Sequence, residues 1–148
     1  MNRKFKIRNY EPSDHAMISE WWEEWGWKPV PPSFLPSSGC IVEDDEGPLY
    51  VAFVYMTGTG ICWLEWLLTS KKIDVSRKRG AKEFLVEELE SMLRATGVEA
   101  IFTTSNDAGL VNGLKKCGFE ISDTNMVQMI KILKRWQQRH LSSLPERR

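Results

Sequence analysis

Three strand-like runs joined by two short turns constrain this chain more than any other feature. Residues 39–42, 49–56 and 61–68 are rich in β-branched, aromatic and other apolar side chains. The turns between them are the acidic Glu43-Asp44-Asp45-Glu46-Gly47 and the small Gly58-Thr59-Gly60. Connections this short join antiparallel neighbours, since a parallel pair needs a crossover of a dozen or more residues. The sequence therefore predicts a three-stranded antiparallel meander.

A strand and a helix are expected before these runs. Phe5 and Ile7 alternate with charged residues, which is typical of a strand with one solvent-facing side. Apolar residues at positions 17, 18, 21, 22 and 25 then follow helical spacing. A proline-rich stretch ends that helix, because proline lacks the backbone N–H that a helix interior needs.

Helices and strands alternate after the meander. Apolar residues at positions 81, 84, 85, 89, 92 and 93 predict the most amphipathic helix of the chain. A short strand at 100–103 and a second helix at 106–117 follow, with Ser105 or Asn106 as the N-cap of that helix. Two closing strands are expected at 119–121 and 126–133.

These elements predict an α/β (α+β) fold with a mixed, mostly antiparallel sheet of six to seven strands and helices on both faces. Strand 61–68, the helix after it and strand 100–103 should form a right-handed parallel crossover. We expect a single domain over residues 1–148, with its core at about 4–134 and a basic tail at 135–148.

Charge balance and residue usage exclude several classes of function. Twenty basic and twenty acidic side chains cancel, so the overall charge gives no attraction to nucleic acid or to a membrane. The apolar runs are too short for a membrane span or a signal peptide, so a cytoplasmic location is expected. Three separated cysteines and two distant histidines argue against a disulfide framework, a metal site and a Ser-His-Asp triad.

A basic segment leads into the most amphipathic helix. Residues 71–82 contain six basic residues and one acidic residue. Exposed cations near a helix N-terminus cost about 0.3–1 kcal/mol each, because the amide N–H groups there carry positive partial charge. A bound phosphate would reverse that preference, and Gly80 would let the backbone approach it closely. The alternative interpretation is a solvated basic loop without a ligand.

Asn106 marks a second place where a ligand is expected. It follows the short strand 100–103 and opens a helix, so it lies at the carboxyl end of a parallel-type strand. Ligands of open α/β sheets gather at that edge, and the basic segment follows the neighbouring strand 61–68. The two positions should therefore face one crevice. A helix cap alone would also explain Asn106.

Taken together, these segments resemble the GNAT family of acetyl-coenzyme A-dependent N-acetyltransferases. The order of elements matches that family over residues 4 to about 134. Arg77-Lys78-Arg79-Gly80-Ala81-Lys82 resembles its Arg/Gln-x-x-Gly-x-Gly/Ala pyrophosphate loop. Asn106, followed by Leu114-Lys115-Lys116-Cys117-Gly118-Phe119, resembles its closing motif of an asparagine, a leucine and a helix that ends in Gly-Phe.

The chain departs from the family pattern at three points. Lys82 stands where the family has glycine or alanine, so its side chain would either crowd the pyrophosphate or donate to it. The segment between Leu68 and Arg77 is slightly longer than usual. The tyrosine that many members use as a general acid falls at Gly113 or Leu114, and residues 56–148 contain no tyrosine.

The resemblance implies that a substrate amine attacks the thioester of acetyl-CoA directly, with acetyl-CoA as cosubstrate and no metal. Backbone groups of Leu67, Leu68 and Thr69 would bind the pantetheine arm, and one N–H there would face the thioester oxygen. Asn106 would contact the same arm. The pyrophosphate would be held by the loop residues Arg77, Lys78, Arg79, Gly80, Ala81 and Lys82.

Glu65 is the candidate general base. It lies in the apolar strand 61–68, between Trp63 and Trp66, next to the expected thioester position. Flanking tryptophans would remove water from the carboxylate and raise its pKa toward the operating pH. The alternative is a structural carboxylate that faces water or pairs with a lysine.

Four tryptophans fall between positions 21 and 27, on the first helix and the loop after it. Their spacing is first of all a core pattern. Two adjacent tryptophans cannot both point fully inward, however, and the family resemblance places this region beside the acceptor substrate. Trp22, Trp25 and Trp27 are therefore candidates for binding a cationic amine through its attraction to their rings.

Two other classes of function stay open at this point. One is a catalytically silent acyl-CoA-binding or partner-binding module on the same fold, since fold alone does not secure activity. The other is a nucleic-acid binder that uses the basic segment with Lys131, Lys134, Arg135 and Arg139, which the zero net charge disfavours. The preferred partners are an amine of a small molecule or a protein, with no nucleic acid and no membrane, and the protein would be a monomer or a homodimer.

Overall fold

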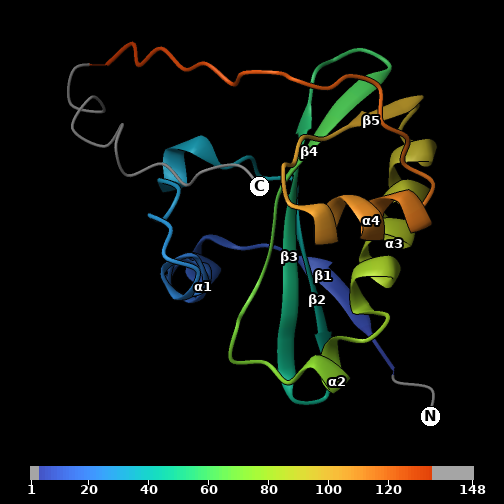
Figure 1. Ribbon diagram of the computed structural model, residues 1–148. Helices are drawn as coiled ribbons and strands as arrows, with labels where there is room; N and C mark the ends of the chain where they lie inside the picture. Colours follow the sequence, from blue (N-terminus) through green and yellow to red (C-terminus); the bar gives the residue numbers. More distant parts are fainter. Residues whose placement is uncertain (1–3, 135–148) are drawn as a thin grey trace.

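The computed structural model describes residues 4–134, which form one five-stranded sheet with helices on both faces (Figure 1). Helix α1 covers one face, and α3 and α4 cover the other. The elements are β1 (Lys6–Asn9), η1 (Pro12–Asp14), α1 (His15–Glu24), η2 (Pro32–Phe34), β2 (Gly39–Asp44), β3 (Gly47–Met56), β4 (Ile61–Thr69), α2 (Val75–Lys78), α3 (Ala81–Ala95), β5 (Ala100–Phe102) and α4 (Ala108–Lys116).

The strand order β1-β2-β3-β4-β5 confirms the predicted meander. Strands β2, β3 and β4 pair antiparallel in sequence, and β1 joins the outer edge of β2, also antiparallel. Strand β5 pairs parallel with β4 after the crossover through α3, as the strand–helix–strand pattern predicts. The mixed, mostly antiparallel sheet is therefore confirmed.

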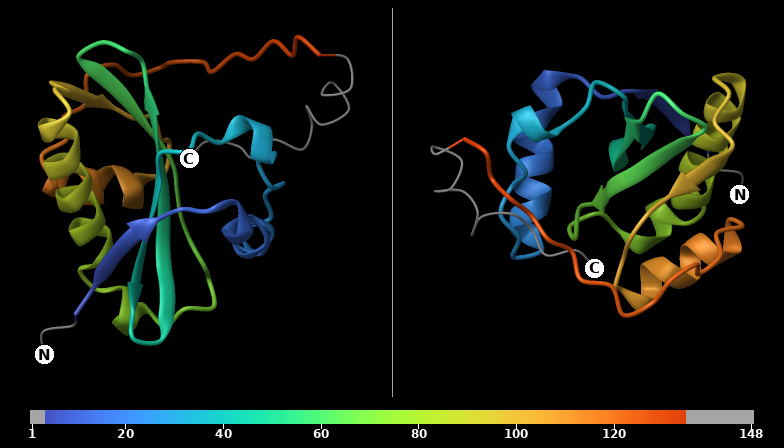
Figure 2. Two further views of the ribbon diagram at one scale, coloured as in Figure 1. Left: turned by 180° about the vertical axis from the view of Figure 1, so that it is seen from behind. Right: turned by 90° about the horizontal axis from the view of Figure 1, so that it is seen from above.

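Alternate residues of the central strands build two cores, one on each face of the sheet (Figure 2). Ile41, Val51 and Phe53 pack against α1, where Ile18 and Trp22 are buried. The residues between them, Val42, Ala52 and Val54, face α3 and its buried Leu85 and Leu89. Successive side chains of a strand point to opposite faces, so one strand serves both layers. Because both faces of these strands are buried, apolar residues occupy nearly every position along them.

The prediction of six to seven strands is wrong, because residues 4–134 contain five. The segments 119–121 and 126–133, expected as closing strands, form neither strand nor helix. After α4 the chain instead runs extended across one end of the molecule toward the side of α1 (Figure 1). An apolar pattern makes a segment able to form a strand, but a strand also needs a neighbour to pair with. The basic tail predicted at 135–148 lies outside the described residues.

No helix within residues 4–134 is long and apolar enough to cross a membrane. In the same residues no cluster of three or more histidine, cysteine, aspartate or glutamate side chains is arranged to hold a metal ion.

Candidate functional site

The candidate site begins where β4 and β5 stop pairing. Their parallel ladder joins Ile61 to Ala100 and ends with the pair Trp63 and Phe102. Just beyond it, the Thr103 hydroxyl donates to the Leu64 carbonyl oxygen at 2.7 Å. A cavity of about 440 Å³ opens past this point, between the last half of β4 and the start of α4. The parting of two parallel strands therefore creates the site.

A β-bulge shapes the wall that β4 gives to the cavity. Val51 of β3 pairs with Leu68 and Phe53 pairs with Glu65, so β4 carries one more residue than β3 over this stretch. Trp66, inside the bulge, has a φ of 55°, which is unusual for a bulky residue. Leu64 packs in the α3-side core and Trp66 in the α1-side core, whereas residues two apart in a regular strand share a face. The bulge thus turns the β4 backbone beside the cavity.

The cavity is lined from both faces of the sheet. Trp22 and Trp66 belong to the core on the α1 side, and Tyr50, Leu64 and Leu67 contact the core on the α3 side. A ligand on one side and a second ligand on the other could therefore meet at the gap between β4 and β5. The lining residues are Trp22, Trp25, Trp27, Tyr50, Leu64, Glu65, Trp66, Leu67, Leu68, Thr69, Lys78, Lys82, Thr103, Thr104, Asp107, Gly109, Leu110 and Leu114.

The β4 residues singled out in the sequence all line this cavity. Leu67, Leu68 and Thr69 follow the bulge, so their backbone lies along the wall where a pantetheine arm was expected. Glu65 precedes the bulge and is 8% exposed, which makes it one of two buried polar or charged residues within 4–134. The structure brings the candidate base and the candidate donor-binding backbone together.

Five of the six residues of the basic loop divide into three groups. Lys78 and Lys82 are half-buried and line the cavity. Gly80 has a φ of 83° and is the N-cap of α3, while Ala81 is fully buried in the first turn. Arg79 ends α2 and is exposed, outside the cavity lining. The loop therefore presents two ammonium groups and a helix N-terminus toward the cavity side of α3.

Arg77 points away from that group. Its Nη2 lies 2.7 Å from Oδ1 of Asp44, and its Nε lies 3.2 Å from Oε2 of Glu46. These ion pairs fasten α2 to the acidic turn between β2 and β3. The Arg77 guanidinium beside Asp44 lowers the pKa of that carboxyl to about 2, although burial opposes the shift. In the sequence, nothing related the acidic turn that contains Asp44 and Glu46 to the basic segment that contains Arg77.

We expect this ion pair to make stability pH-dependent between about pH 4 and pH 2. An aspartate with a folded-state pKa below its ordinary value of about 3.9 stabilises the fold above that value, and the contribution is lost as the pH falls through the folded pKa. Asp44→Asn should therefore lower the urea midpoint at pH 6 and differ far less from the parent at pH 2.5. Asp45→Asn, on the exposed neighbour, is the control. An Asp44→Asn protein as stable as the parent at pH 6 would contradict the pairing.

Lys78 and Lys82 line the cavity close enough for their charges to interact. Loss of water around Lys78 lowers its pKa, the charge of Lys82 lowers it further, and Glu24 opposes both. The Lys78 ammonium donates to the Ser70 carbonyl oxygen at 3.3 Å. The Lys82 ammonium lies over α4, where a Cβ added to Gly113 would stand 2.7 Å from it. Two mutually repelling cations in a half-buried position favour an anionic ligand.

Asn106 is exposed and does not line the cavity, whereas its neighbour Asp107 does. Asp107 is also the N-cap of α4, because its carboxylate accepts the Leu110 N–H at 2.9 Å. The prediction of Ser105 or Asn106 as N-cap is therefore wrong. The Ser105 hydroxyl instead accepts the Asp107 N–H at 3.0 Å, which closes the turn before the helix.

The tryptophans contribute to both the core and the cavity. Trp22 is 1% exposed and meets the Trp66 ring edge-on, with centroids 6.3 Å apart. Trp25 is 36% exposed, and its indole N–H donates to the Thr69 carbonyl oxygen at 2.8 Å. Its ring stacks on Trp27 at 5.8 Å, with Lys71 Nζ 4.7 Å from its centroid. All three predicted residues line the cavity, with Trp22 also serving the core.

A carboxylate fixes α1 beside the end of β4. Glu24 accepts the buried Ser70 hydroxyl at 2.9 Å and the Lys71 N–H at 3.0 Å. The last turn of α1 is thereby tied to the loop that follows β4, which holds the tryptophans at the cavity.

Tyr50 lines the cavity without having been singled out in the sequence. It pairs with Thr69 in the β3–β4 ladder, and burial raises the pKa of its phenol. Counting back from the Gly58-Thr59-Gly60 turn would have placed Tyr50 opposite the end of β4. Trp66, named in the sequence only as a neighbour of Glu65, also lines the cavity, but its place in a bulge could not be predicted from residue spacing.

Solved structures share this overall fold. One is the ribosomal-protein-S18-alanine N-acetyltransferase from Escherichia coli, with a TM-score of 0.67 and 13% identity over 81% of this chain and 80% of that one. A second is a GNAT-family acetyltransferase from Streptococcus pneumoniae, with a TM-score of 0.65 and 14% identity over 87% of this chain and 100% of that one. The chain has the GNAT fold.

A third structure with the GNAT fold contains coenzyme A. It is N-acetylglutamate synthase from Neisseria gonorrhoeae, complexed with coenzyme A and N-acetyl-glutamate. Its TM-score is 0.61 at 18% identity, over 78% of this chain and 28% of that one, so this chain corresponds to a part of the synthase. No protein-family model matches the sequence, and no curated protein matches it. The resemblance to the GNAT fold seen in the sequence is therefore confirmed by structure.

Proposed function

We propose that this protein is an N-acetyltransferase that moves the acetyl group of acetyl-CoA directly to an amine. The observation that carries the proposal is the cavity at the β4–β5 gap, lined from both faces of the sheet. A donor on the α3 side and an acceptor on the α1 side can meet there without a covalent enzyme intermediate. The coenzyme A bound to a neighbour of the same fold gives further support.

The donor side is built for a polyanion next to a long, uncharged arm. Lys78, Lys82 and the N-terminus of α3, which begins at Ala81, would hold the phosphates. The Leu67–Thr69 backbone would bind the pantetheine amides along β4. Arg77, held by Asp44, would position the loop and leave the phosphate contacts to the two lysines.

The chemical step needs an uncharged amine beside the thioester. The Glu65 carboxylate would take a proton from the substrate ammonium, after which the nitrogen lone pair attacks the thioester carbonyl carbon. The C–N bond forms, the C–S bond breaks, and coenzyme A leaves as a thiolate that takes its proton from water. Thr104 lines the cavity and is a second donor for this proton, whereas Ser105 lies outside the lining. Backbone amides at the bulge would stabilise the negative oxygen of the tetrahedral intermediate.

The acceptor side favours a cationic amine with apolar neighbours. Lys71 already places an ammonium 4.7 Å from the centroid of the Trp25 ring, so that ring face accommodates a cation. Trp27, which stacks on Trp25, and Trp66 also line the cavity, as does Glu65. A primary amine beside an apolar or aromatic group would suit this wall, whether it belongs to a small molecule or to a protein.

Acetyl-CoA should raise the melting temperature of the protein. At a ligand concentration one hundred times the dissociation constant, binding to the folded state adds about 2.7 kcal/mol, which is about 5–10 °C for a chain of this size. Differential scanning calorimetry with and without millimolar acetyl-CoA measures the shift. The control is acetyl-pantetheine, which lacks the nucleotide phosphates and should give a smaller shift.

Release of the coenzyme A thiol in the presence of a panel of amines then tests turnover. Binding without thiol release from any amine would favour the silent acyl-CoA-binding module, which the absence of tyrosine from residues 56–148 motivates. A melting temperature that acetyl-CoA leaves unchanged would refute the donor site and the proposed function together.

A further inference from the structure

The segment after α4 carries apolar side chains that stay largely exposed within the described residues 4–134. We call residues 126–133 the C-terminal arm, and six of its eight residues are apolar. Met126, Val127, Met129 and Leu133 are 72%, 83%, 87% and 85% exposed. A large apolar side chain left in water forgoes the free energy that its burial would release. A run of this kind on a folded protein marks a contact surface.

The sheet offers a matching unfilled position at β5. Within residues 4–134, β5 pairs with β4 on one side and has no strand on the other. Ala100 and Phe102 are exposed, and Ile101 between them contacts the core on the α3 side. The N–H and C=O groups along such an edge are a template for one more strand.

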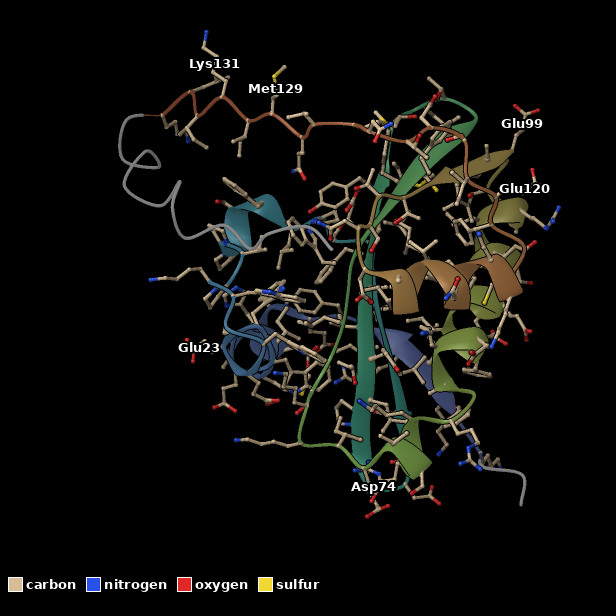
Figure 3. All side chains as sticks on the ribbon, in the orientation of Figure 1. Glu23, Asp74, Glu99, Glu120, Met129 and Lys131 are labelled. Carbon is tan, nitrogen blue, oxygen red and sulfur yellow. The ribbon has the colours of Figure 1, made fainter. Side chains whose placement is uncertain are left out.

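Charge distinguishes the two surfaces. Glu99 immediately precedes β5, and Glu120 follows α4 at the same side of the molecule (Figure 3). Lys131 lies on the arm next to Met129, and Figure 3 shows both at the opposite side from the two glutamates. The arm of a molecule therefore extends away from that molecule's own β5 edge, while its lysine complements the acidic groups there.

We propose that the C-terminal arm of one copy of this chain adds antiparallel to the β5 edge of a second copy, and that the second copy reciprocates. With Met129 opposite Ile101, Ile130 stands opposite Ala100 and Lys131 opposite Glu99. Met129 then extends the α3-side core that Ile101 already contacts. The pairing is independent of the proposed acetyl transfer.

A second copy is the partner that satisfies both surfaces at once. Within residues 4–134 each molecule has one exposed arm and one open edge at β5, so a two-fold pair buries both arms and fills both β5 edges. Such an exchange closes on itself and leaves no arm for further growth. A different protein bound at β5 would leave the arm uncovered.

Solution mass gives the first test. Sedimentation equilibrium or light scattering of the full chain should show a dimer, and Met129→Asp should shift it to monomer by placing a charge in the new core. Met92→Asp is the matched control, because Met92 is an exposed methionine on α3, away from the arm. Circular dichroism checks that both variants fold. A monomeric parent protein, or a dimer that survives Met129→Asp, overturns the proposal.

Disulfide trapping separates exchange from pairing within one chain. Directly opposite residues of antiparallel strands have Cα atoms about 4.5–5.5 Å apart, within reach of a disulfide. Ala100→Cys and Ile130→Cys, each in a Cys117→Ser background, are unfolded together, refolded and oxidised. A covalent dimer containing one copy of each is expected. A chain that carries both Ala100→Cys and Ile130→Cys tests pairing within one molecule. If the mixture of the two separate variants yields no covalent dimer, the exchange is refuted, even where the chain with both cysteines closes an internal disulfide.

Discussion

Replacing Glu65 with glutamine should lower kcat by about a hundredfold to ten-thousandfold, the usual cost of losing a general base. Glutamine keeps the size and hydrogen-bonding capacity of the side chain but cannot accept the proton of the substrate ammonium. Glu65 lines the cavity at the start of the bulge, with 8% of its surface exposed, so the proton it takes comes from a substrate rather than from bulk water. Acetyl-CoA affinity should stay the same, because the proposed donor contacts lie further along β4 and on α3.

The pH–rate profile distinguishes a base from a structural carboxylate. If Glu65 is the base, the rate of the parent protein should fall as the pH is lowered and the carboxylate becomes protonated, and Glu65→Gln should lack this fall. Glu23→Gln is the control, since Glu23 is an exposed carboxylate on α1, which Figure 3 shows at the outer side of that helix, and it lies outside the cavity lining. A parent-like rate at saturating amine would assign Glu65 to structure. The amine would then lose its proton to water.

Much of the scaffold around this glutamate could be predicted from local sequence. The Gly58-Thr59-Gly60 turn forces β3 and β4 to pair antiparallel, which fixes the direction of the strand that carries Glu65. The amphipathic pattern over α3 then requires β5 to run parallel to β4. Short turns and a helical crossover leave few topologies, so the position of the cavity at the carboxyl ends of these strands followed from the element order.

Features that depend on contacts distant in sequence could not be predicted. The Arg77–Asp44 ion pair joins residues 33 positions apart, and each belonged to a charge run that would also suit solvent. The bulge at Trp66 shifts the register by one residue through a local φ of 55°, which no residue preference of tryptophan indicates. The prediction of a strand at 126–133 was wrong for a different reason. The segment has a strand-like apolar pattern, but no strand within residues 4–134 of the same chain pairs with it.

Replacing Lys82 with glutamate should weaken coenzyme A binding by about tenfold to a hundredfold or more. A hydrogen bond to a charged group contributes about 1.5–3 kcal/mol, and charge reversal adds repulsion to that loss. Lys82 occupies the first turn of α3 and reaches over Gly113, so its ammonium lies on the path between the helix N-terminus and α4. Calorimetric titration with coenzyme A measures the loss, and Lys72→Glu, on an exposed lysine outside the cavity lining, is the control.

Lys82→Met gives the sharper form of the test because ligand binding and free-protein stability should move independently. In the unliganded protein, Lys82 lowers the pKa of Lys78 and lies at the unfavourable end of the α3 dipole. Removing its charge should therefore leave the melting temperature of the free protein equal or higher, while the stabilisation by acetyl-CoA shrinks. Affinity for acetyl-pantetheine, which lacks the nucleotide phosphates, should not change. Equal losses for both ligands would place Lys82 beside the pantetheine arm, and a less stable free protein would make it a structural residue.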